Sequence, residues 1–246
     1  MQPARVENEP TRPNSPDVRV VQVRSGLPRW IDFILAALGL VAVSPVLLIA
    51  AVAIRVSSPG PIIFRQERVG QRGRRFWMYK LRSMTVRREP GTTITAANDP
   101  RITTVGRLLR KTKLDELPEL WNILKGDMSI VGPRPEVPEY VDLRNPSWNL
   151  VLEVRPGLTD PVTLLLRNEE ALLGLVREDR ESFYLHHLQP FKLTGYLAYL
   201  AKRNSWTDMK VIGSTARAIL ANQCPCPSVE EIVRAANPSG GPVRTA

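Results

Sequence analysis

The chain has 246 residues, of which 43% are hydrophobic and 24% are charged. This balance is typical of one large or two small globular domains, and it excludes wholesale disorder, a collagen-like fibre and a transporter with many membrane spans. Two cysteines and two histidines exclude a disulfide framework and argue against a histidine-rich metal site, while the net charge of +10 suggests a polyanionic or membrane-surface partner.

Residues 1–28 contain proline and arginine without hydrophobic periodicity, which predicts a disordered arm. The longest apolar run follows at 33–54, and its 22 residues carry no charge. As a helix, this run would be about 33 Å long, enough to cross a hydrocarbon core of about 30 Å. Its length and uniformity disfavour a buried helix of a soluble protein, and its length and late start disfavour a cleaved signal peptide.

Pro45 lies in the middle of this run and predicts a break into two pieces, 33–43 and 46–54. Ser44 can satisfy the carbonyl that the proline leaves without a donor. Arginines stand on both sides of the run, and positive flanks tend to stay cytoplasmic. The residues favour a hairpin that enters and leaves the membrane by one face, with a kinked crossing helix as the alternative.

After the membrane segment, residues 62–69 and 74–82 resemble strands, and the glycines of 70–73 between them predict a β-hairpin. The excess charge is local, because residues 55–88 hold ten Lys or Arg and a single acid, Glu67. Aromatic residues alternate with cations in the second strand, as in nucleic-acid binders and at lipid interfaces. The adjoining apolar run favours the lipid interface.

The densest group of unusual residues lies at 106–136. Leucines and a tryptophan recur with helical spacing over 114–124, and they predict one buried helix face. Pro118 is tolerated only in a first turn, so the helix should begin near Asp115 and end at Gly126. Asp115 and Glu116 then lie at a helix N-terminus, where the helix dipole keeps a carboxylate ionised. They could be a nucleophile or a Mg²⁺ ligand, although ordinary capping is the alternative.

Cations surround this pair of carboxylates. Four precede it, namely Arg107, Arg110, Lys111 and Lys113. Arg134 follows between two prolines, and a rigidly held guanidinium suits bidentate binding of phosphate. Carboxylates with convergent cations suggest a diphosphate substrate bridged by Mg²⁺. The neighbouring membrane segment suggests that one substrate is a lipid.

The remainder predicts helices and a tail. Residues 191–203 and 205–220 have amphipathic helical patterns, the second with a stripe of Met209, Ile212, Ala216 and Ile219. Such helices either pack on their own domain or lie at a membrane surface. Residues 221–246 resemble a loose tail, and Cys224 and Cys226 within it are better interpreted as incidental thiols than as half of a metal site.

Several motifs together resemble the bacterial sugar transferase family, the monotopic phosphoglycosyl transferases that act on polyprenyl phosphate. They are NDPRIT from Asn98, then Gly106, then KTKLDELPELWNILKGDMSIVGPRPE ending at Glu136. The resemblance covers about residues 28–220, from the Ser44-Pro45 segment through RQERVGQRGRRFWMYKLRSM to RPGLT from Arg155.

The resemblance implies a predominantly α fold with a short β-hairpin (α+β). It also implies one re-entrant membrane helix broken at Ser44-Pro45, together with interfacial amphipathic helices. We expect a disordered cytoplasmic arm at 1–28, the re-entrant helix at 29–56, a catalytic domain at 57–220 and a loose tail at 221–246.

The family's chemistry carries over onto matching positions. Asp115 would attack the β-phosphate of a UDP-sugar, release UMP and hold the sugar-phosphate until polyprenyl phosphate accepts it. Glu116 would complete the dyad, and Mg²⁺ would join Asp115 to the donor diphosphate. The other implied site residues are Arg110 and Arg134, expected on phosphate, and Lys80 and Arg82, in a motif near the site. The implied location is the cytoplasmic face of the bacterial inner membrane, with no nucleic-acid partner, and a homodimer is compatible with it.

Two departures from the family stand out: Lys113 replaces a frequent serine, and Leu158-Thr-Asp-Pro replaces a frequent Ile-Thr-Gly. Three other functions compete with this one. A membrane adaptor would tolerate neutral residues at 115 and 116, a nucleic-acid binder would leave the apolar run unexplained, and an ordinary glycosyl transferase would release UDP. A glycosidase is disfavoured because adjacent side chains on a helix diverge and cannot flank one bond.

Overall fold

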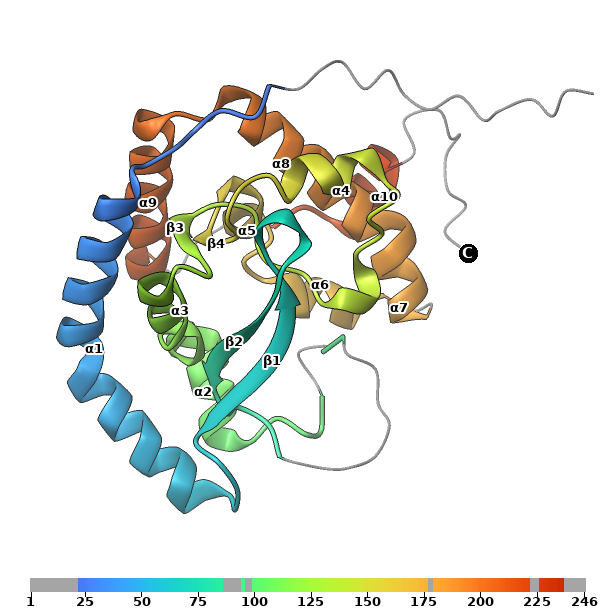
Figure 1. Ribbon diagram of the computed structural model, residues 1–246. Coiled ribbons are helices and arrows are strands. Elements are labelled where there is room, and N and C mark those ends of the chain that lie inside the picture. The colour runs from blue at the N-terminus through green and yellow to red at the C-terminus, as the bar shows by residue number, and fades with distance from the viewer. Residues whose placement is uncertain (1–21, 86–93, 96–98, 177–178, 222–225, 237–246) are drawn as a thin grey trace, which may run out of the picture.

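The computed structural model describes residues 22–85, 94–95, 99–176, 179–221 and 226–236. Within these ranges the chain is mostly helical, and its strands form two small sheets of two strands each. A single long helix, α1, runs along one side of the molecule, and the remaining elements lie on its concave side (Figure 1). The predominantly helical fold with a short β-hairpin is therefore confirmed.

Helix α1 (Arg29–Ser57) is the one helix in the described ranges that is long and apolar enough to cross a membrane. The predicted division into two pieces is wrong, because the helix continues through Pro45. Pro45 has no N–H to donate to the carbonyl of Val41, four residues earlier. The Ser44 hydroxyl donates to that carbonyl oxygen instead, at 2.8 Å, as the sequence suggested. The helix bends along its length but is not interrupted (Figure 1).

Polar groups fasten both ends of α1 to the rest of the molecule. Near its start, the buried carboxylate of Asp32 accepts a hydrogen bond from the backbone N–H of Ile130 at 3.0 Å. Arg29 donates to the carbonyl oxygen of Met128 at 3.0 Å. Past its end, Arg82 donates to the carbonyl oxygen of Ser58 at 2.7 Å. The two ends of this apolar helix therefore contact one and the same domain.

The predicted hairpin is present as β1 (Ile63–Val69) and β2 (Arg75–Leu81), an antiparallel pair in which Ile63 lies opposite Leu81. Arg72 adopts the left-handed backbone conformation in the turn, with φ of 58°. The second sheet pairs β3 (Ser129–Val131) with β4 (Gly157–Thr159) in parallel, and it was not predicted.

The other helices are α2 (Thr104–Thr112), α3 (Glu119–Lys125), α4 (Pro146–Val151), α5 (Pro161–Leu165), α6 (Glu169–Leu175), α7 (Arg180–Phe183), α8 (Gln189–Lys202), α9 (Ser205–Ala221) and α10 (Val229–Ala236). Short 3-10 turns occupy Gln71–Gly73, Leu114–Glu116 and Pro138–Tyr140, and a π-helical turn occupies Tyr184–Leu188. One main core joins the hairpin, β3 and the helices from α3 onward. A smaller cluster of Ala50, Ile54, Leu81 and Leu109 joins the second half of α1 to β2 and α2.

The predicted helices at 191–203 and 205–220 correspond to α8 and α9. However, the stripe predicted on α9 is not its buried face, because Met209 and Ile219 are 46% and 53% exposed. Asp208, Val211 and Ala218 are buried instead. Asp208 is fully buried, and its charge is compensated there by an ion pair with Arg203 and by a hydrogen bond from the N–H of Leu27. A polar network therefore decides which face of α9 packs inward.

The structure describes parts of the expected arm and tail, and these parts are packed. Val23 and Leu27 contact the main core, so residues 22–28 are held in place. In the tail, α10 buries Ile232 completely, and Cys226 packs against the same core. Residues 1–21 and 237–246, and Cys224 with them, lie outside the described residues.

Candidate active site

Asp115 and Glu116 lie in the 3-10 turn Leu114–Glu116, between α2 and α3. The helix predicted to start at Asp115 instead starts at Glu119, with Pro118 as its N-cap residue. Lys113 precedes the turn in the left-handed conformation, with φ of 59°, and its N–H donates to the carbonyl oxygen of Arg110. This uncommon conformation turns the chain sharply just before the carboxylates.

Glu116 holds two of the predicted cations. Its Oε1 atom accepts hydrogen bonds from Lys80 Nζ at 2.9 Å and from Arg134 Nη2. The same two nitrogens lie 3.5 Å from Oε1 of Glu119, which is completely buried. The sequence analysis did not single out Glu119. Two cations and two carboxylates therefore form one compact group, the Glu116 cluster (Lys80, Glu116, Glu119 and Arg134).

The environment moves the pKa values of these carboxyls in opposite directions. Burial raises the pKa of Glu116, but Arg134 and Lys80 outweigh burial and hold that pKa well below its usual range. Burial raises the pKa of Glu119, and the same two cations do not fully compensate. Glu116 is therefore the ionised partner of the two cations.

Asp115 is buried, with 6% of its surface exposed. Burial and the neighbouring charge of Glu116 raise its pKa, while Lys80, Lys113 and Arg110 oppose that rise. Its Oδ1 atom is buried and accepts no hydrogen bond within the described residues. A buried carboxylate oxygen without a hydrogen-bond partner destabilises the folded state unless a substrate or an ion binds it. This oxygen is therefore a candidate reacting or ligating atom.

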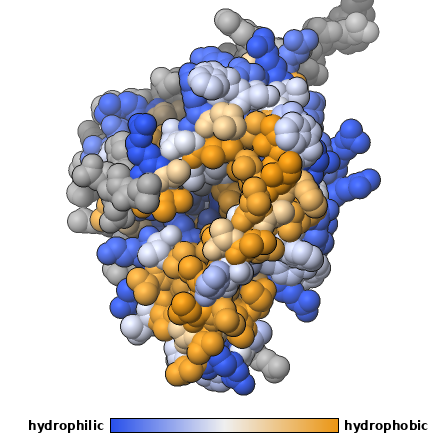
Figure 2. Space-filling model, turned by 90° about the vertical axis from the view of Figure 1, so that its left-hand side faces the viewer, coloured by the Kyte–Doolittle hydropathy of each residue, from blue (hydrophilic) through white to orange (hydrophobic). Residues whose placement is uncertain are grey.

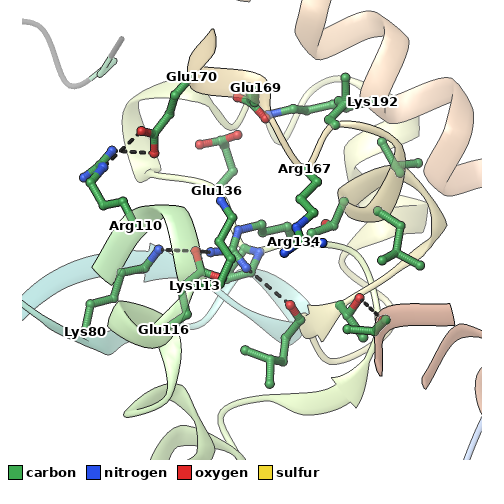
Figure 3. A pocket seen from close by; sticks show the side chains of 18 of the residues that line it. Lys80, Arg110, Lys113, Glu116, Arg134, Glu136, Arg167, Glu169, Glu170 and Lys192 are labelled. Carbon is green, nitrogen blue, oxygen red and sulfur yellow. Dashed lines mark hydrogen bonds and ion pairs between the residues drawn. The ribbon is translucent and has the colours of Figure 1, made fainter. Parts of the chain in front are cut away.

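A cavity of about 510 Å³ opens beside the two carboxylates, and Figure 3 shows the charged side chains that line it. Among the described residues, seven cationic and four acidic side chains line this pocket. The cations are Arg68, Lys80, Arg110, Lys113, Arg134, Arg167 and Lys192, and the acids are Glu116, Glu136, Glu169 and Glu170. The excess of positive charge suits a ligand with more than one phosphate group.

Three of the predicted site residues line this pocket together with Glu116, namely Lys80, Arg110 and Arg134. Arg110 is engaged by Glu170, whose two carboxylate oxygens lie 3.0 Å from Nε and 2.6 Å from Nη2. Asp115 is adjacent to the wall rather than part of it. Arg82 is not brought to the pocket: its guanidinium binds carbonyl oxygens that follow the C-terminal end of α1, and it is 4% exposed.

Several pocket residues carry no local sequence signal. Arg167 and Lys192 come from segments far from the 106–136 motif, and Glu169 and Glu170 begin a short helix. Arg167 and Lys113 have no acidic partner among the described side chains, and Arg167 donates to the carbonyl oxygen of Ala218. Arg167, Lys192, Glu169 and Glu170 reach the site only through tertiary folding, so sequence spacing could not reveal them.

One wall of the pocket is apolar. It includes Ile212, Ala216 and Ile219 from α9 and Leu117 after the 3-10 turn. Helix α9 and the long apolar helix α1 both contact β3. Figure 2 shows the face of the molecule on which α1 lies, where apolar side chains surround a hollow. The pocket thus combines cationic groups with a lipid-compatible wall.

The fit of a metal ion can be judged from the carboxylates present. Among the described residues, no three Asp, Glu, His or Cys side chains are grouped so that they could hold a metal ion by themselves. Mg²⁺ commonly binds one or two protein carboxylates and completes its shell with phosphate oxygens and water. The orphaned Oδ1 of Asp115 fits an ion of that kind.

The sequence is similar to a known protein family and to several of its members. Residues 23–222 match the family model described as bacterial sugar transferase. The UDP-glucose:undecaprenyl-phosphate glucose-1-phosphate transferase of Caulobacter vibrioides is 37% identical over 214 residues, which is 85% of this chain and 74% of that protein. A UDP-N-acetylgalactosamine-undecaprenyl-phosphate N-acetylgalactosaminephosphotransferase of Aeromonas hydrophila is 42% identical over 198 residues, which is 79% of this chain and 44% of that protein. The chain therefore spans less than half the length of the Aeromonas relative.

Proposed function

Because the chain belongs to the bacterial sugar transferase family, we propose that it transfers a sugar-1-phosphate from a UDP-sugar to undecaprenyl phosphate. The products are UMP and undecaprenyl-diphospho-sugar, and the reaction is the first membrane step in the assembly of a polysaccharide or glycoconjugate. The observation that carries this proposal is the pocket in which cations outnumber acids beside the buried carboxylate of Asp115.

The chemistry assigned to Asp115 is nucleophilic catalysis. A carboxylate oxygen attacks the β-phosphorus of the donor, the bond from that phosphorus to the bridging oxygen breaks, and UMP leaves with the oxygen. The sugar-phosphate is then held on Asp115. A phosphate oxygen of undecaprenyl phosphate attacks the same phosphorus and restores the free carboxylate. The first half-reaction needs Asp115 to be ionised, and the second releases it as a carboxylate. Burial raises the pKa of Asp115, and the nearby Lys80, Lys113 and Arg110 oppose that rise.

The Glu116 cluster positions the phosphate groups. Arg134 and Lys80 stabilise the negative charge of the transferring phosphoryl group, because preorganised cations in a partly buried site cost little reorganisation. Glu116 holds both cations in place before the substrate binds. Arg110 contributes a further guanidinium at the edge of the same pocket. Arg82 acts instead through α1, whose end it fixes.

Mg²⁺ is the cofactor we assign to this site. Asp115 would hold the ion, with the donor diphosphate completing its shell. When bound, the ion would neutralise phosphate charge and favour the departure of UMP. Chelation with EDTA should abolish UMP release, and added Mg²⁺ should restore it.

The membrane arrangement we propose is re-entrant. A helix of 29 residues is about 44 Å long, so a crossing helix would place its ends on opposite sides of the bilayer. Both ends of α1 are instead bound to one domain, through Asp32 and through Arg82. Arginines flank the helix on both sides, which favours the cytoplasmic face of the inner membrane for the catalytic domain.

The activity is tested by measuring nucleotide release from the full chain in nanodiscs, with undecaprenyl phosphate, Mg²⁺ and a panel that includes UDP-glucose and UDP-N-acetylgalactosamine. Wild type should release UMP with at least one donor, and Asp115→Asn should lose that release by at least about 10³-fold. Asp142→Asn is the matched control, because this exposed carboxylate forms its ion pair with Arg144, away from the pocket lining. Release of UDP, or an active Asp115→Asn variant, would contradict the mechanism.

The topology has a separate test. In a variant with Cys224 and Cys226 changed to serine, single cysteines are introduced at Ser25, before α1, and at Ser57, its last residue. Both should be protected from a membrane-impermeant maleimide in spheroplasts and should react after permeabilisation. Reaction of only one position in intact spheroplasts would show a crossing helix and refute the re-entrant arrangement.

A further inference from the structure

Arg110, one of the cations expected to bind phosphate, is occupied by a carboxylate of its own chain. Glu170 at the start of α6 receives hydrogen bonds from Nε and Nη2 of Arg110, so the pair is bidentate (Figure 3). A third nitrogen of the guanidinium, Nη1, donates to the hydroxyl of Ser83 at 3.1 Å. The edge of Arg110 that faces Glu170 is the edge best suited to two oxygens of a phosphate group.

Glu170 differs from the other acids of the pocket in how it is held. Glu136 is engaged by Arg68, Tyr184 and the N–H of Val137. Glu169 pairs with the well-buried Lys192. In the described part of the chain, the carboxylate of Glu170 has Arg110 as its sole hydrogen-bond partner, and its side chain is 33% exposed. The carboxylate of Glu170 can therefore move from Arg110 into water, and no other buried group loses a hydrogen-bond partner when it does.

We propose that Glu170 occupies, in the substrate-free enzyme, the position on Arg110 that a phosphate of the nucleotide donor takes when it binds. This inference rests on the proposed function, because it concerns the diphosphate of the same donor. The carboxylate imitates the two-oxygen geometry of the phosphate, and binding exchanges one anion for the other. Glu170 is then a residue that tunes donor affinity, and it does not touch the reacting atoms.

Two physical consequences follow from this exchange. The guanidinium of Arg110 stays neutralised and aimed at the pocket while the pocket is empty, so it needs little reordering when the donor arrives. The competition between Glu170 and phosphate also weakens donor binding. For a partly exposed ion pair the expected weakening is about fivefold, the factor that corresponds to about 1 kcal/mol.

Binding of UDP measures this exchange directly, since UDP carries both phosphates and no transferable sugar. The full chain in nanodiscs is titrated with UDP as wild type, Glu170→Gln and Glu153→Gln, with the Mg²⁺ concentration held constant. Glutamine keeps the size of the side chain and removes its charge. Glu153 is an exposed acid outside the pocket lining and is the matched control.

Glu170→Gln should bind UDP about fivefold more tightly than wild type and Glu153→Gln, and should lower KM for the active donor while kcat stays within about twofold. If the Arg110–Glu170 ion pair only holds α2 and α6 together, Glu170→Gln should bind UDP as tightly as wild type or more weakly. That result would overturn the inference. If Glu170→Gln melts markedly earlier than wild type, Glu170→Asp supplies the second variant. It keeps the charge on a shorter side chain and should give a smaller gain in affinity.

A double-mutant cycle makes the test specific for Arg110. In the Arg110→Gln background, Glu170→Gln should change UDP affinity by less than about 1.5-fold, because no guanidinium is left to compete for. An undiminished effect in that background would overturn the inference. Failure of the wild type to release UMP from any donor is a different result, and it would contradict the proposed function itself.

Discussion

Arg134 connects the two carboxylates of the Glu116 cluster, and replacing it with methionine removes this connection without leaving a large void. Its Nη2 atom bonds Glu116 and lies 3.5 Å from the completely buried Glu119, and its Nη1 atom donates to the carbonyl oxygen of Leu158 at 3.3 Å. In Arg134→Met, Lys80 would be the one cation, among the described residues, left within ion-pair distance of both carboxylates.

The cost of this change follows from burial. Breaking a buried ion pair by removing one partner destabilises a protein by about 3–5 kcal/mol. Arg134 and Glu116 retain 24% and 18% side-chain exposure, so the lower end of that range applies. For a chain of this size, about 3 kcal/mol corresponds to a loss of about 6–12 °C in Tm.

Tryptophan fluorescence during heating in nanodiscs measures this loss. Arg144→Met is the matched control, because Arg144 forms its ion pair at the surface with 92% of its side chain exposed, and its Tm should not move. Adding Glu119→Gln to Arg134→Met removes a carboxyl group that is left buried without its guanidinium, and it should recover part of the loss. An Arg134→Met variant that melts with the Arg144→Met control would refute the role assigned to the cluster.

Two further predictions concern stability. Burial raises the pKa of Asp160 from 3.8 to about 6, so the stabilisation that comes from its protonated carboxyl is fully present below about pH 4 and is lost as the pH rises through about 6. Asp160→Asn should therefore reduce the difference in stability between pH 5 and pH 8, measured as Tm, by about 1.4 kcal/mol. Gly106→Ala would place a Cβ atom 1.8 Å from the backbone oxygen of Ser83 and should cost about 3 kcal/mol in thermal unfolding, whereas Gly213→Ala, with open space around it in α9, should leave Tm unchanged or raise it.

Local patterns predicted the local elements well. The glycines of 70–73 between two strand-like segments gave the hairpin, since a turn and its flanking strands are encoded by neighbouring residues. The apolar run predicted α1, and the amphipathic patterns of 191–203 and 205–220 predicted α8 and α9. The β3–β4 pair escaped prediction because each strand has three residues and their partners lie about 28 positions apart.

The exposure of individual side chains, and which of them reach the site, depend on tertiary contacts that cannot be predicted from local sequence patterns. Trp121 belongs to the helically spaced set over 114–124 that was expected to form one buried face, yet it is 52% exposed. Arg82 lies two positions from Lys80 in β2 and its continuation, but it caps α1 while Lys80 enters the pocket. The sequence could therefore nominate Asp115, Glu116, Arg110 and Arg134 as candidate site residues, but it could not reveal that Glu119 and Glu170 also lie against these cations.

The two fastenings of α1 have a mechanical consequence. Asp32 ties the start of the helix to β3, and Arg82 ties the chain just past its end to β2. A helix clamped at both ends cannot pivot beneath its domain as a tethered anchor would. In the re-entrant arrangement proposed above, the depth of α1 in the lipid would therefore also fix the height of the pocket, and the bilayer would set the distance between the acceptor's phosphate and Asp115.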